Sequence, residues 1–318
     1  MKKKIVAIAI ATALAAMSLT GCSTKKSAYT VGICQLIQHE ALDAATQGFQ
    51  DALKDKLGDS VTFDVQNASG DSATCATIAN QFVSSNVDLI MANATPALQA
   101  SASATDKIPI LGTSVTDYAT ALQIENWTGT TGVNISGTSD LAPLKEQAAM
   151  IKELFPEAKT VGMLYCSAEP NSVYQIEVVT AELVSLGYTC VNYSFADSND
   201  IASVCTNAVS NVDVIYIPTD NTAAAATEVI NNICEPAGIP VVSGEEGICK
   251  GCGVATLSIS YYDLGYQTGL MAYEILVNGA DVSKMEIEFA PNTTKKYIPA
   301  RAEALGITIP EGYEAIEE

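Results

Sequence analysis

The sequence predicts an α/β protein of two similar lobes, each with a parallel sheet, joined by a three-segment hinge. Three observations predict this fold. Segments of the first half recur in the second half, short apolar runs alternate with amphipathic stretches, and the C-terminal part is too short for a third domain. The roughly 290 residues that follow the N-terminal segment also fit two lobes, at the usual ~100 to 200 residues per domain.

The internal repeat consists of three segments that recur in the same order. YTVGICQ (29–35) matches KTVGMLY (159–165), SNVDLIMANATPA (85–97) matches SNVDVIYIPTDNT (210–222), and IPILGTS (108–114) matches IPVVSGE (239–245). The offsets of 130, 125 and 131 residues are nearly equal. They are far longer than the repeat of a solenoid, so they indicate two lobes of similar plan.

Within each half, short apolar runs fit strands buried on both faces. In the first half we expect strands at 29–36, 61–66, 87–92, 108–112 and 130–133, and helices at 40–57, 72–85 and 96–105. In the second half we expect strands at 160–165, 188–193, 212–217, 239–242 and 254–258, and helices at 171–186, 199–209 and 222–236. Strand and helix in alternation predict parallel sheets with helices on both faces.

The C-terminal part contains one long helix at 261–279, a strand in MEIEFA, and a tail with a further strand and a short helix. These elements complete the two lobes if the chain crosses between them near 134–142, 258–263 and 286–293. Three crossings make a hinge. The predicted first lobe is 29–136 plus 262–286, and the second is 137–261 plus 287–318.

The N-terminal segment MKKKIVAIAIATALAAMSLTGC has the layout of a secretory signal, with lysines, an apolar run and small residues before Cys22. The ending LTGC also resembles a bacterial lipobox, in which the Cys is lipidated and becomes the first mature residue. The alternative is an ordinary cleaved signal with an incidental Cys. We expect residues 1–21 to be a signal peptide, 22–28 to be a lipidated tether, and the protein to lie on the extracytoplasmic face of the cell membrane.

The charge balance argues against nucleic acid as a partner. The chain has 16 Lys and Arg and 36 Asp and Glu, a formal charge of −20. Loss of residues 1–21 removes three lysines and leaves 13 basic and 36 acidic groups, or −23, whereas a nucleic-acid interface is basic. The only His, His39, and the CKGC motif lack the ligand spacing of a metal site. Eight further cysteines besides Cys22 fit either free thiols or bridges, and no bridge is assigned.

The loops after the predicted strands are the place to look for a ligand site, because ligands bind beyond the carboxyl ends of parallel strands. In the first lobe, Thr95 with the following Pro, together with Thr113 and Ser114, gathers uncharged donors at a positive helix end, which suits a carboxylate. The opposing loops hold acids that could take an ammonium: Glu169, Asp220, Glu245 and Glu246. Such walls suit a zwitterion, of which an amino acid is the simplest. The alternative is that Thr95, Ser172 and Asp220 only cap helices.

These residues also resemble a known family. The segments VGICQLIQHEALDAATQGFQDAL, VDLIMANATPALQA, EPNSVYQ, YIPTDNT, SGEEG and YYDLGYQTG are similar to those of substrate-binding lipoproteins of ABC importers with the type I periplasmic-binding-protein fold, in the branch associated with tryptophan and other aromatic amino acids. The resemblance covers about residues 29–310. It implies two Rossmann-like lobes that close over a ligand, delivery to a membrane permease, no cofactor and no catalysis.

The resemblance also implies a set of pocket residues. They are Thr95, Thr113, Asp117, Asn171, Ser172, Asp220, Asn221 and Glu245. The sequence departs from the family pattern at Gly112 and Tyr118, where relatives more often carry a bulky residue and a Pro, and at CKGC, which replaces an uninterrupted loop. The first departure touches the pocket and therefore bears on which side chain is recognised.

The sequence therefore predicts a monomeric, lipid-anchored binding protein that captures an amino acid, expected to be aromatic, for an ABC permease. A sugar or nucleoside is a weaker alternative. Sugar sites in this fold commonly use arginine and stacked indole rings, whereas here Arg301 is the only Arg and Trp127 the only Trp. Another small amino acid and a ligand sensor that docks on a membrane receptor stay open. An enzyme has little support from one His and no GxSxG motif.

Overall fold

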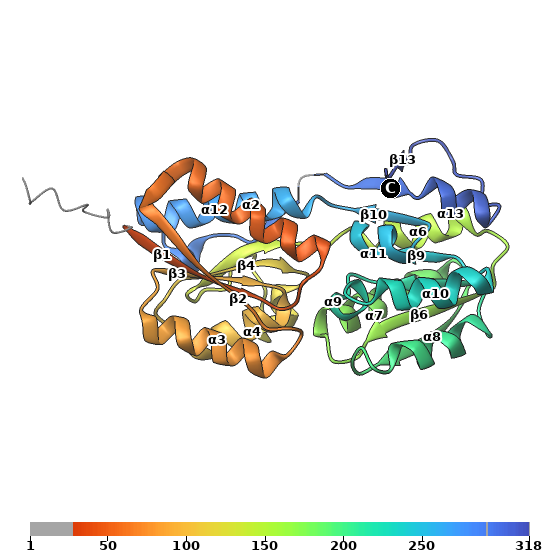
Figure 1. Ribbon diagram of the computed structural model, residues 1–318, viewed down its shortest axis with the longest axis horizontal. Coiled ribbons are helices and arrows are strands. Elements are labelled where there is room, and N and C mark those ends of the chain that lie inside the picture. Colours follow the sequence, from red (N-terminus) through yellow and green to blue (C-terminus); the bar gives the residue numbers. More distant parts are fainter. Residues whose placement is uncertain (1–27, 291, 318) are drawn as a thin grey trace, which may run out of the picture.

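The computed structural model describes residues 28–290 and 292–317, so the expected signal peptide and Cys22 lie outside the described residues. Figure 1 shows two lobes side by side along the long axis. The first contains the N-terminal elements, drawn red to yellow, and the blue helix α12 (Tyr261–Asn278), while the green and cyan elements build the second. Each lobe has its own sheet. The two-lobed α/β fold expected from the repeat is therefore present.

The sheet of the first lobe has six strands in the order β11-β5-β4-β3-β1-β2, and every pair in it is parallel. The strands are β1 (Tyr29–Gln35), β2 (Val61–Asn67), β3 (Leu89–Asn93), β4 (Ile110–Val115), β5 (Ile135–Ser139) and β11 (Glu288–Phe289). The helices besides α12 are α2 (Glu40–Leu57), α3 (Ser72–Ser85), α4 (Thr95–Ala104) and α5 (Tyr118–Leu122), with short 3-10 turns at η1 (Gly58–Ser60) and η2 (Val282–Lys284).

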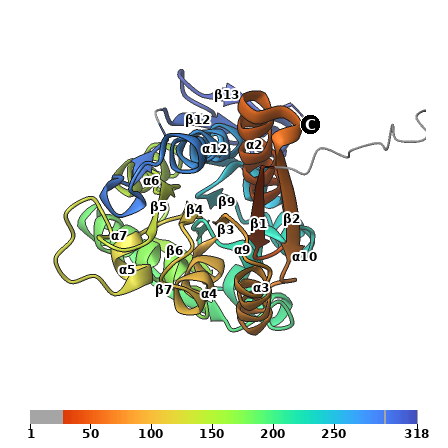
Figure 2. The same ribbon diagram turned by 90° about the vertical axis from the view of Figure 1, so that its left-hand side faces the viewer.

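Helices cover both faces of this sheet, as its nearly continuous apolar strands require. Figure 2 shows α2 and α12 on one side and α3 and α4 on the other. Successive residues of a strand face opposite ways. Accordingly, Ile33 packs in the core with Phe49 of α2, whereas Cys34 packs in the core with Phe82 of α3.

Helix α12 belongs to the first lobe although it follows the second lobe in sequence. It lies against α2, and glycines at the crossing bring the two backbones close together. A Cβ at Gly265 would lie 1.9 Å from the Ala45 carbonyl oxygen, and one at Gly48 would lie 2.1 Å from that of Tyr262. Only residues without a side chain allow this approach. The glycines therefore fix the position at which α12 packs on α2 of the first lobe.

The sheet of the second lobe has seven strands in the order β13-β12-β10-β9-β8-β6-β7, and only the β10–β12 pair is antiparallel. The strands are β6 (Thr160–Cys166), β7 (Thr189–Phe195), β8 (Val214–Ile217), β9 (Val241–Ser243), β10 (Ala255–Ser258), β12 (Thr294–Tyr297) and β13 (Glu314–Ala315). The helices are α6 (Leu144–Leu154), α7 (Pro170–Ser185), α8 (Ile201–Val209), α9 (Asn221–Ala224), α10 (Thr227–Ala237), α11 (Glu246–Cys252) and α13 (Pro299–Ala304). One core lies under α6 and α7, and the other under α8, α10 and α11.

Two of the predicted elements are wrong. Residues 130–133 form no strand, because Gly132 adopts a φ of 71° and the neighbouring strand begins only at Ile135. The single helix expected at 222–236 is two helices, α9 and α10, because Ala226 leaves helical geometry at φ −126° and ψ 22°. A run of alanines favours helix and gives no sign of this break.

The sheets also shift two of the predicted lobe boundaries. The boundary after residue 136 falls inside β5, and the one after 286 precedes β11, whose Glu288 pairs with Thr138 of β5. The chain passes between the sheets at three places: between β5 and α6, between β10 and α12, and between β11 and β12. The three crossings thus lie within or beside the segments expected from the sequence.

Candidate ligand-binding cleft

The loops that follow the parallel strands of the two lobes meet across the gap between them. His39, before α2, lies with Nε2 3.2 Å from Oδ1 of Asn221, at the start of α9. Glu40 of α2 forms an ion pair with Lys250 of α11. Both contacts join residues of opposite lobes, so the lobes are closed on each other. Burial lowers the pKa of His39, which favours the neutral imidazole at this contact.

The wall of the first lobe contains a helix N-terminus without a side-chain cap. Helix α4 begins at Thr95, and Ala94 before it has no side chain that could accept from the first N–H groups. Ala94 is held at a φ of 91° and Ser114 at 54°, a conformation that non-glycine residues rarely adopt. Such strain clusters at ligand sites. The N-terminus of α4, which has no side-chain cap, is thus the kind of helix end that suits an anion.

Two hydroxyls beside this helix end lack hydrogen bonds. Thr95 Oγ1 and Ser114 Oγ are buried, and neither has a partner among the residues that the structure describes. They follow β3 and β4, which are adjacent strands. An unpaired buried hydroxyl costs free energy, so both are available to a hydrogen-bonding group from outside the described residues.

Thr113 and Asp117 are placed differently. The Thr113 hydroxyl lies 3.2 Å from Thr138 Oγ1, which in turn lies 2.8 Å from Thr268 Oγ1 of α12. This chain of hydroxyls ties the sheet to α12. Asp117 is half-buried and caps α5 by accepting from Thr120 N at 2.7 Å. The structure therefore gives both residues partners within their own lobe.

The wall of the second lobe carries acids that are engaged with backbone N–H groups. Asp220 Oδ1 accepts from Ala223 N at 2.8 Å, and its Oδ2 accepts from Cys166 N at 2.6 Å. Both oxygens of Glu245 likewise accept from the first turn of α11. Burial raises the pKa of Asp220 to about 7, to which the charge of Glu169 contributes, and burial also raises the pKa of Glu245 to about 7.

Glu169 holds the start of α9 to the loop before α7. Its Oε1 accepts from the N and Oγ1 of Thr222 at 2.8 and 2.7 Å, and its Oε2 accepts from the N and Nδ2 of Asn221 at 3.1 and 2.6 Å. Glu246 is paired with Lys296 Nζ at 2.6 Å. The sequence-predicted acids of this wall thus neutralise helix N-termini and lysines of the protein.

Asn171 and Ser172 begin α7 and are buried. Asn171 Nδ2 donates to Glu169 Oε2 at 3.2 Å and to the carbonyl of Thr219 at 3.1 Å, and Ser172 Oγ donates to the same carbonyl at 3.5 Å. Asn171 Oδ1, however, has no partner among the described residues. This acceptor is the second lobe's counterpart to the unpaired hydroxyls of the first.

Sequence reasoning missed two residues at the hinge, Asp140 and Tyr261. Asp140 is 3% exposed, its Oδ2 accepts from the Tyr261 hydroxyl at 2.9 Å, and its Oδ1 has no partner in the described part of the chain. Burial raises the pKa of Asp140, and hydrogen bonding by the side chains of Thr116 and Tyr261 opposes this rise. The rule that predicted the other site residues, namely that a polar residue directly after a parallel strand faces the ligand side, also applies to Asp140. It was missed because that strand was expected at 130–133 and not at β5.

Three of the buried atoms without a partner among the described residues lie at the ends of neighbouring strands, whereas two others, Asn93 Oδ1 and Ser101 Oγ, lie within β3 and α4. Thr95 follows β3, Ser114 lies at the end of β4, and Asp140 follows β5, which neighbours β4. Adjacent parallel strands bring such residues to one edge of the sheet. Neutral donors at one end and a carboxylate oxygen at the other therefore line a single edge, with Asn171 contributed by the second lobe.

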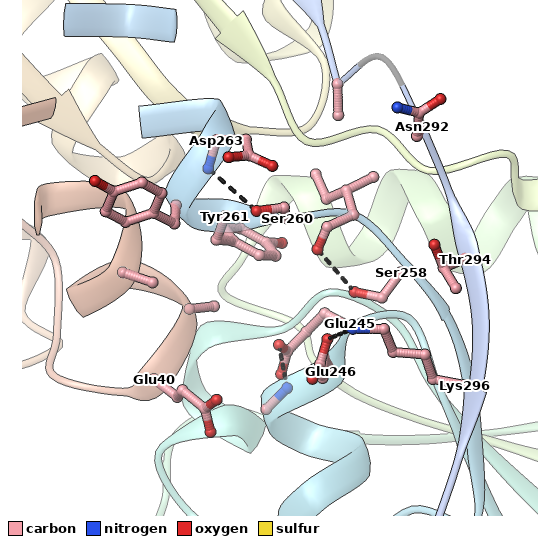
Figure 3. Close-up of a pocket in the computed structure, with 16 residues that line it drawn as sticks. Glu40, Glu245, Glu246, Ser258, Ser260, Tyr261, Asp263, Asn292, Thr294 and Lys296 are labelled. Atoms are coloured by element: carbon pink, nitrogen blue, oxygen red, sulfur yellow. Dashed lines mark hydrogen bonds and ion pairs between the residues drawn. The ribbon is translucent and has the colours of Figure 1, made fainter. Parts of the chain in front are cut away.

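A separate cavity of about 340 Å³ opens beside the hinge (Figure 3). Tyr261, Glu245 and Ser258 line it together with the Glu246–Lys296 pair. None of the unpaired groups of Thr95, Ser114, Asp140 and Asn171 lines this cavity. Within residues 28–290 and 292–317, no three His, Cys, Asp or Glu side chains are arranged to hold a metal ion, and no helix is long and apolar enough to cross a membrane.

Comparisons with known proteins agree with this architecture. The family model described as ABC transporter substrate binding protein matches residues 30–315. A protein named "Tyrosine-binding protein" from Clostridioides difficile is 35% identical over 291 residues, which cover 86% of this chain and 84% of that protein.

Two solved structures bear on the conformation. A Streptococcus pneumoniae ABC domain in complex with L-Trp is 32% identical, with a TM-score of 0.86 and coverage of 92% of this chain and all of that one. A ligand-free, open substrate-binding protein from Clostridium difficile is 35% identical, with a TM-score of 0.69 and coverage of 91% and 99%. The better fit to the ligand-bound structure agrees with the His39–Asn221 contact between closed lobes.

More distant structures share the fold alone. A leucine-binding protein from Thermotoga maritima is 15% identical, with a TM-score of 0.62 and coverage of 79% of this chain and 83% of that one. The family and the type I fold expected from the sequence are both confirmed. With a family match over nearly all of the described residues and two hinged α/β lobes, this chain belongs to the ABC transporter substrate-binding protein family.

Proposed function

We propose that the protein captures an aromatic amino acid between its two lobes and delivers it to an ABC permease. Proteins of this family are extracytoplasmic and work with ABC transporters. The relatives named for tyrosine and solved with L-Trp support the ligand class. The observation that carries the proposal is the row of unpaired polar groups at the ends of β3, β4 and β5.

The ligand carboxylate would lie at the N-terminus of α4. This helix end has free N–H groups and is flanked by the unpaired hydroxyls of Thr95 and Ser114. In the second lobe, by contrast, Asp220 and Glu245 already cap the N-termini of α9 and α11. A second anion is disfavoured there, so the carboxylate is directed to the first lobe.

The ligand ammonium would pair with Asp140. Its Oδ1 is buried and unpaired, and an ammonium would supply the missing donor and stabilise the charged carboxylate. The sequence pattern favoured the acids of the second lobe, Asp220 and Glu245 among them, for this role. Both oxygens of Asp220 and of Glu245 accept backbone hydrogen bonds, which leaves Asp140 as the better-suited acid.

Three finer features belong to the same proposal. We infer that Cys22 is lipidated and attaches the chain to the membrane, since LTGC stands at the end of a signal-like segment. A binding protein that hands its ligand to a permease needs no catalytic step, so no reaction is expected. A single chain already supplies both walls of the cleft, and a monomer is sufficient.

Mass spectrometry of the ligand released by denaturing the purified protein tests this function directly. L-Tyr, L-Trp or L-Phe is the expected product. Thermal-shift measurements extend the test with two matched analogues of tyrosine, tyramine, which lacks the carboxylate, and 3-(4-hydroxyphenyl)propionate, which lacks the amine. Both should stabilise the protein much less than tyrosine. Stabilisation by a sugar or nucleoside with no response to amino acids would contradict the proposal.

A further inference from the structure

We propose that Cys205 and Cys234 form a disulfide bond within the second lobe when the protein meets a disulfide donor. The two Sγ atoms lie 3.5 Å apart. Cys205 belongs to α8 and Cys234 to α10, and these helices pack against each other on one face of the sheet. The inference concerns neither the cleft nor the ligand, and it holds whichever solute is bound.

The geometry needs only a small movement. A disulfide has a sulfur–sulfur distance of about 2.05 Å, so the two atoms must approach by roughly 1.5 Å. Both side chains are buried in the same apolar core, with Cys205 0% and Cys234 2% exposed. The two sulfurs therefore already lie near each other within one core.

A small cavity lies beside one of the two cysteines. It measures about 100 Å³ and lies beside α10 and α13, with Cys234, Cys252 and Arg301 in its lining. Cys205 does not line it. A small disulfide would therefore reach Cys234 first, and Cys205 would react only afterwards, from inside the core.

The reaction is a two-step thiol–disulfide exchange. The Cys234 sulfur attacks one sulfur of the donor, and its proton passes to the donor thiol that is released, which leaves a mixed disulfide at Cys234. Cys205 then attacks the Cys234 sulfur, which forms the internal disulfide and releases the second donor thiol. The two protein thiols lose two electrons and two protons in total, and the donor gains them. Proteins of this family are extracytoplasmic, in a compartment type where disulfides can persist.

The neighbouring thiols are less suited to this bond. Cys252 lines the same cavity, but its Sγ donates to the Ile248 carbonyl at 3.4 Å. Cys190 of β7 packs against the other core of the lobe, the one under α6 and α7, and is only partly buried. These two residues are therefore matched controls for accessibility and for non-specific oxidation.

Peptide mapping of the full chain tests the proposal. The protein is treated with hydroxyethyl disulfide, its free thiols are alkylated before denaturation and again after it, and the non-reduced digest is sequenced by mass spectrometry. A cross-linked pair of peptides containing Cys205 and Cys234 is expected, in the wild type and in the Cys252→Ser and Cys190→Ser variants. Closing the loop of some 30 residues should raise the Tm of the oxidised over the reduced protein by about 5 to 10 °C.

Three results would overturn the proposal. One is alkylation of both Cys205 and Cys234 after treatment. Another is a bond between Cys234 and Cys252, and the third is a mixed disulfide at Cys234 that does not resolve. The Cys205→Ala variant provides the internal check, since it should keep its fold, stop at the mixed disulfide, and show no rise in Tm.

Discussion

The hydroxyl of Tyr261 donates a 2.9 Å hydrogen bond to Oδ2 of Asp140. Asp140 lies on the chain segment after β5, and Tyr261 is the first residue of α12, directly after the segment from β10, so the bond joins two of the three crossings between the lobes. The bond thus fixes the carboxylate at the hinge, with its other oxygen unpaired in the interior. A ligand that supplies a cation there would also bind the part of the molecule that moves during closure.

Asp140→Asn should weaken the binding of L-Tyr and L-Trp by about 30- to 1,000-fold, because a buried charge-assisted pair is lost. The substituted side chain keeps its size and can still accept from Tyr261. Calorimetry measures the effect. The tyrosine analogue without an amine should bind the variant at least as well as it binds the wild type. Unchanged affinity for the amino acids would remove Asp140 from the site.

Thr95→Val should lower amino-acid affinity by about 10- to 100-fold, since a hydroxyl bonded to a carboxylate is worth about 1.5 to 3 kcal/mol. The stability of the ligand-free protein should not fall, because this hydroxyl has no partner in the described protein. Thr113→Val is the matched control, because its hydroxyl lies in the chain with Thr138 and Thr268. It should reduce stability and leave affinity nearly unchanged, and the reverse pattern would contradict this assignment.

Asp220→Ala should destabilise the fold by about 2 kcal/mol, because two backbone N–H groups, those of Cys166 and Ala223, lose their acceptor. Urea denaturation without ligand measures the change. Asp220→Asn keeps one acceptor oxygen and should fall between the wild type and the alanine variant. Full stability with lost affinity would instead support the interpretation from the sequence, in which Asp220 binds the ammonium.

Much of this architecture could be predicted from sequence because it depends on local patterns. The buried strands, the alternation with helices and the two-lobed repeat all follow from apolar runs and their spacing. Thr95 and Ser114 are predicted as site residues because residues after the strands of a parallel sheet line the side where ligands bind. The same rule failed for Asp140 only because β5 was placed at 130–133, where glycines interrupt the extended chain.

The other differences between the expectations from the sequence and the structure depend on contacts between residues far apart in the chain. Whether an acid binds a ligand or caps a helix is decided by which N–H groups surround it, and for Asp220 these include Cys166 N, 54 positions away in the chain. The pairing of Cys205 with Cys234 likewise depends on how α8 packs on α10. Neither contact can be predicted from a local sequence pattern.

The stability of the ligand-free protein should rise as the pH falls from 7 toward 5. Burial raises the pKa of Asp220 and of Glu245 to about 7, whereas the unfolded chain titrates such groups near pH ~4. Across this interval the folded protein holds protons that the unfolded chain has lost. The stabilising contribution is therefore complete below about pH 4 and is lost as the pH rises through about 7.

Ligand binding should show the opposite trend over the same interval. Pairing with an ammonium requires charged Asp140, whose pKa burial raises, and burial of His39 in the closed state opposes its protonation. Both effects weaken binding at lower pH. Melting curves with and without L-Tyr at pH 5, 6 and 7 test the two trends together. The Tm without ligand should rise as the added shift with ligand shrinks, and Asp140→Asn should flatten the second trend. A ligand shift that grows on acidification would contradict the pairing with Asp140.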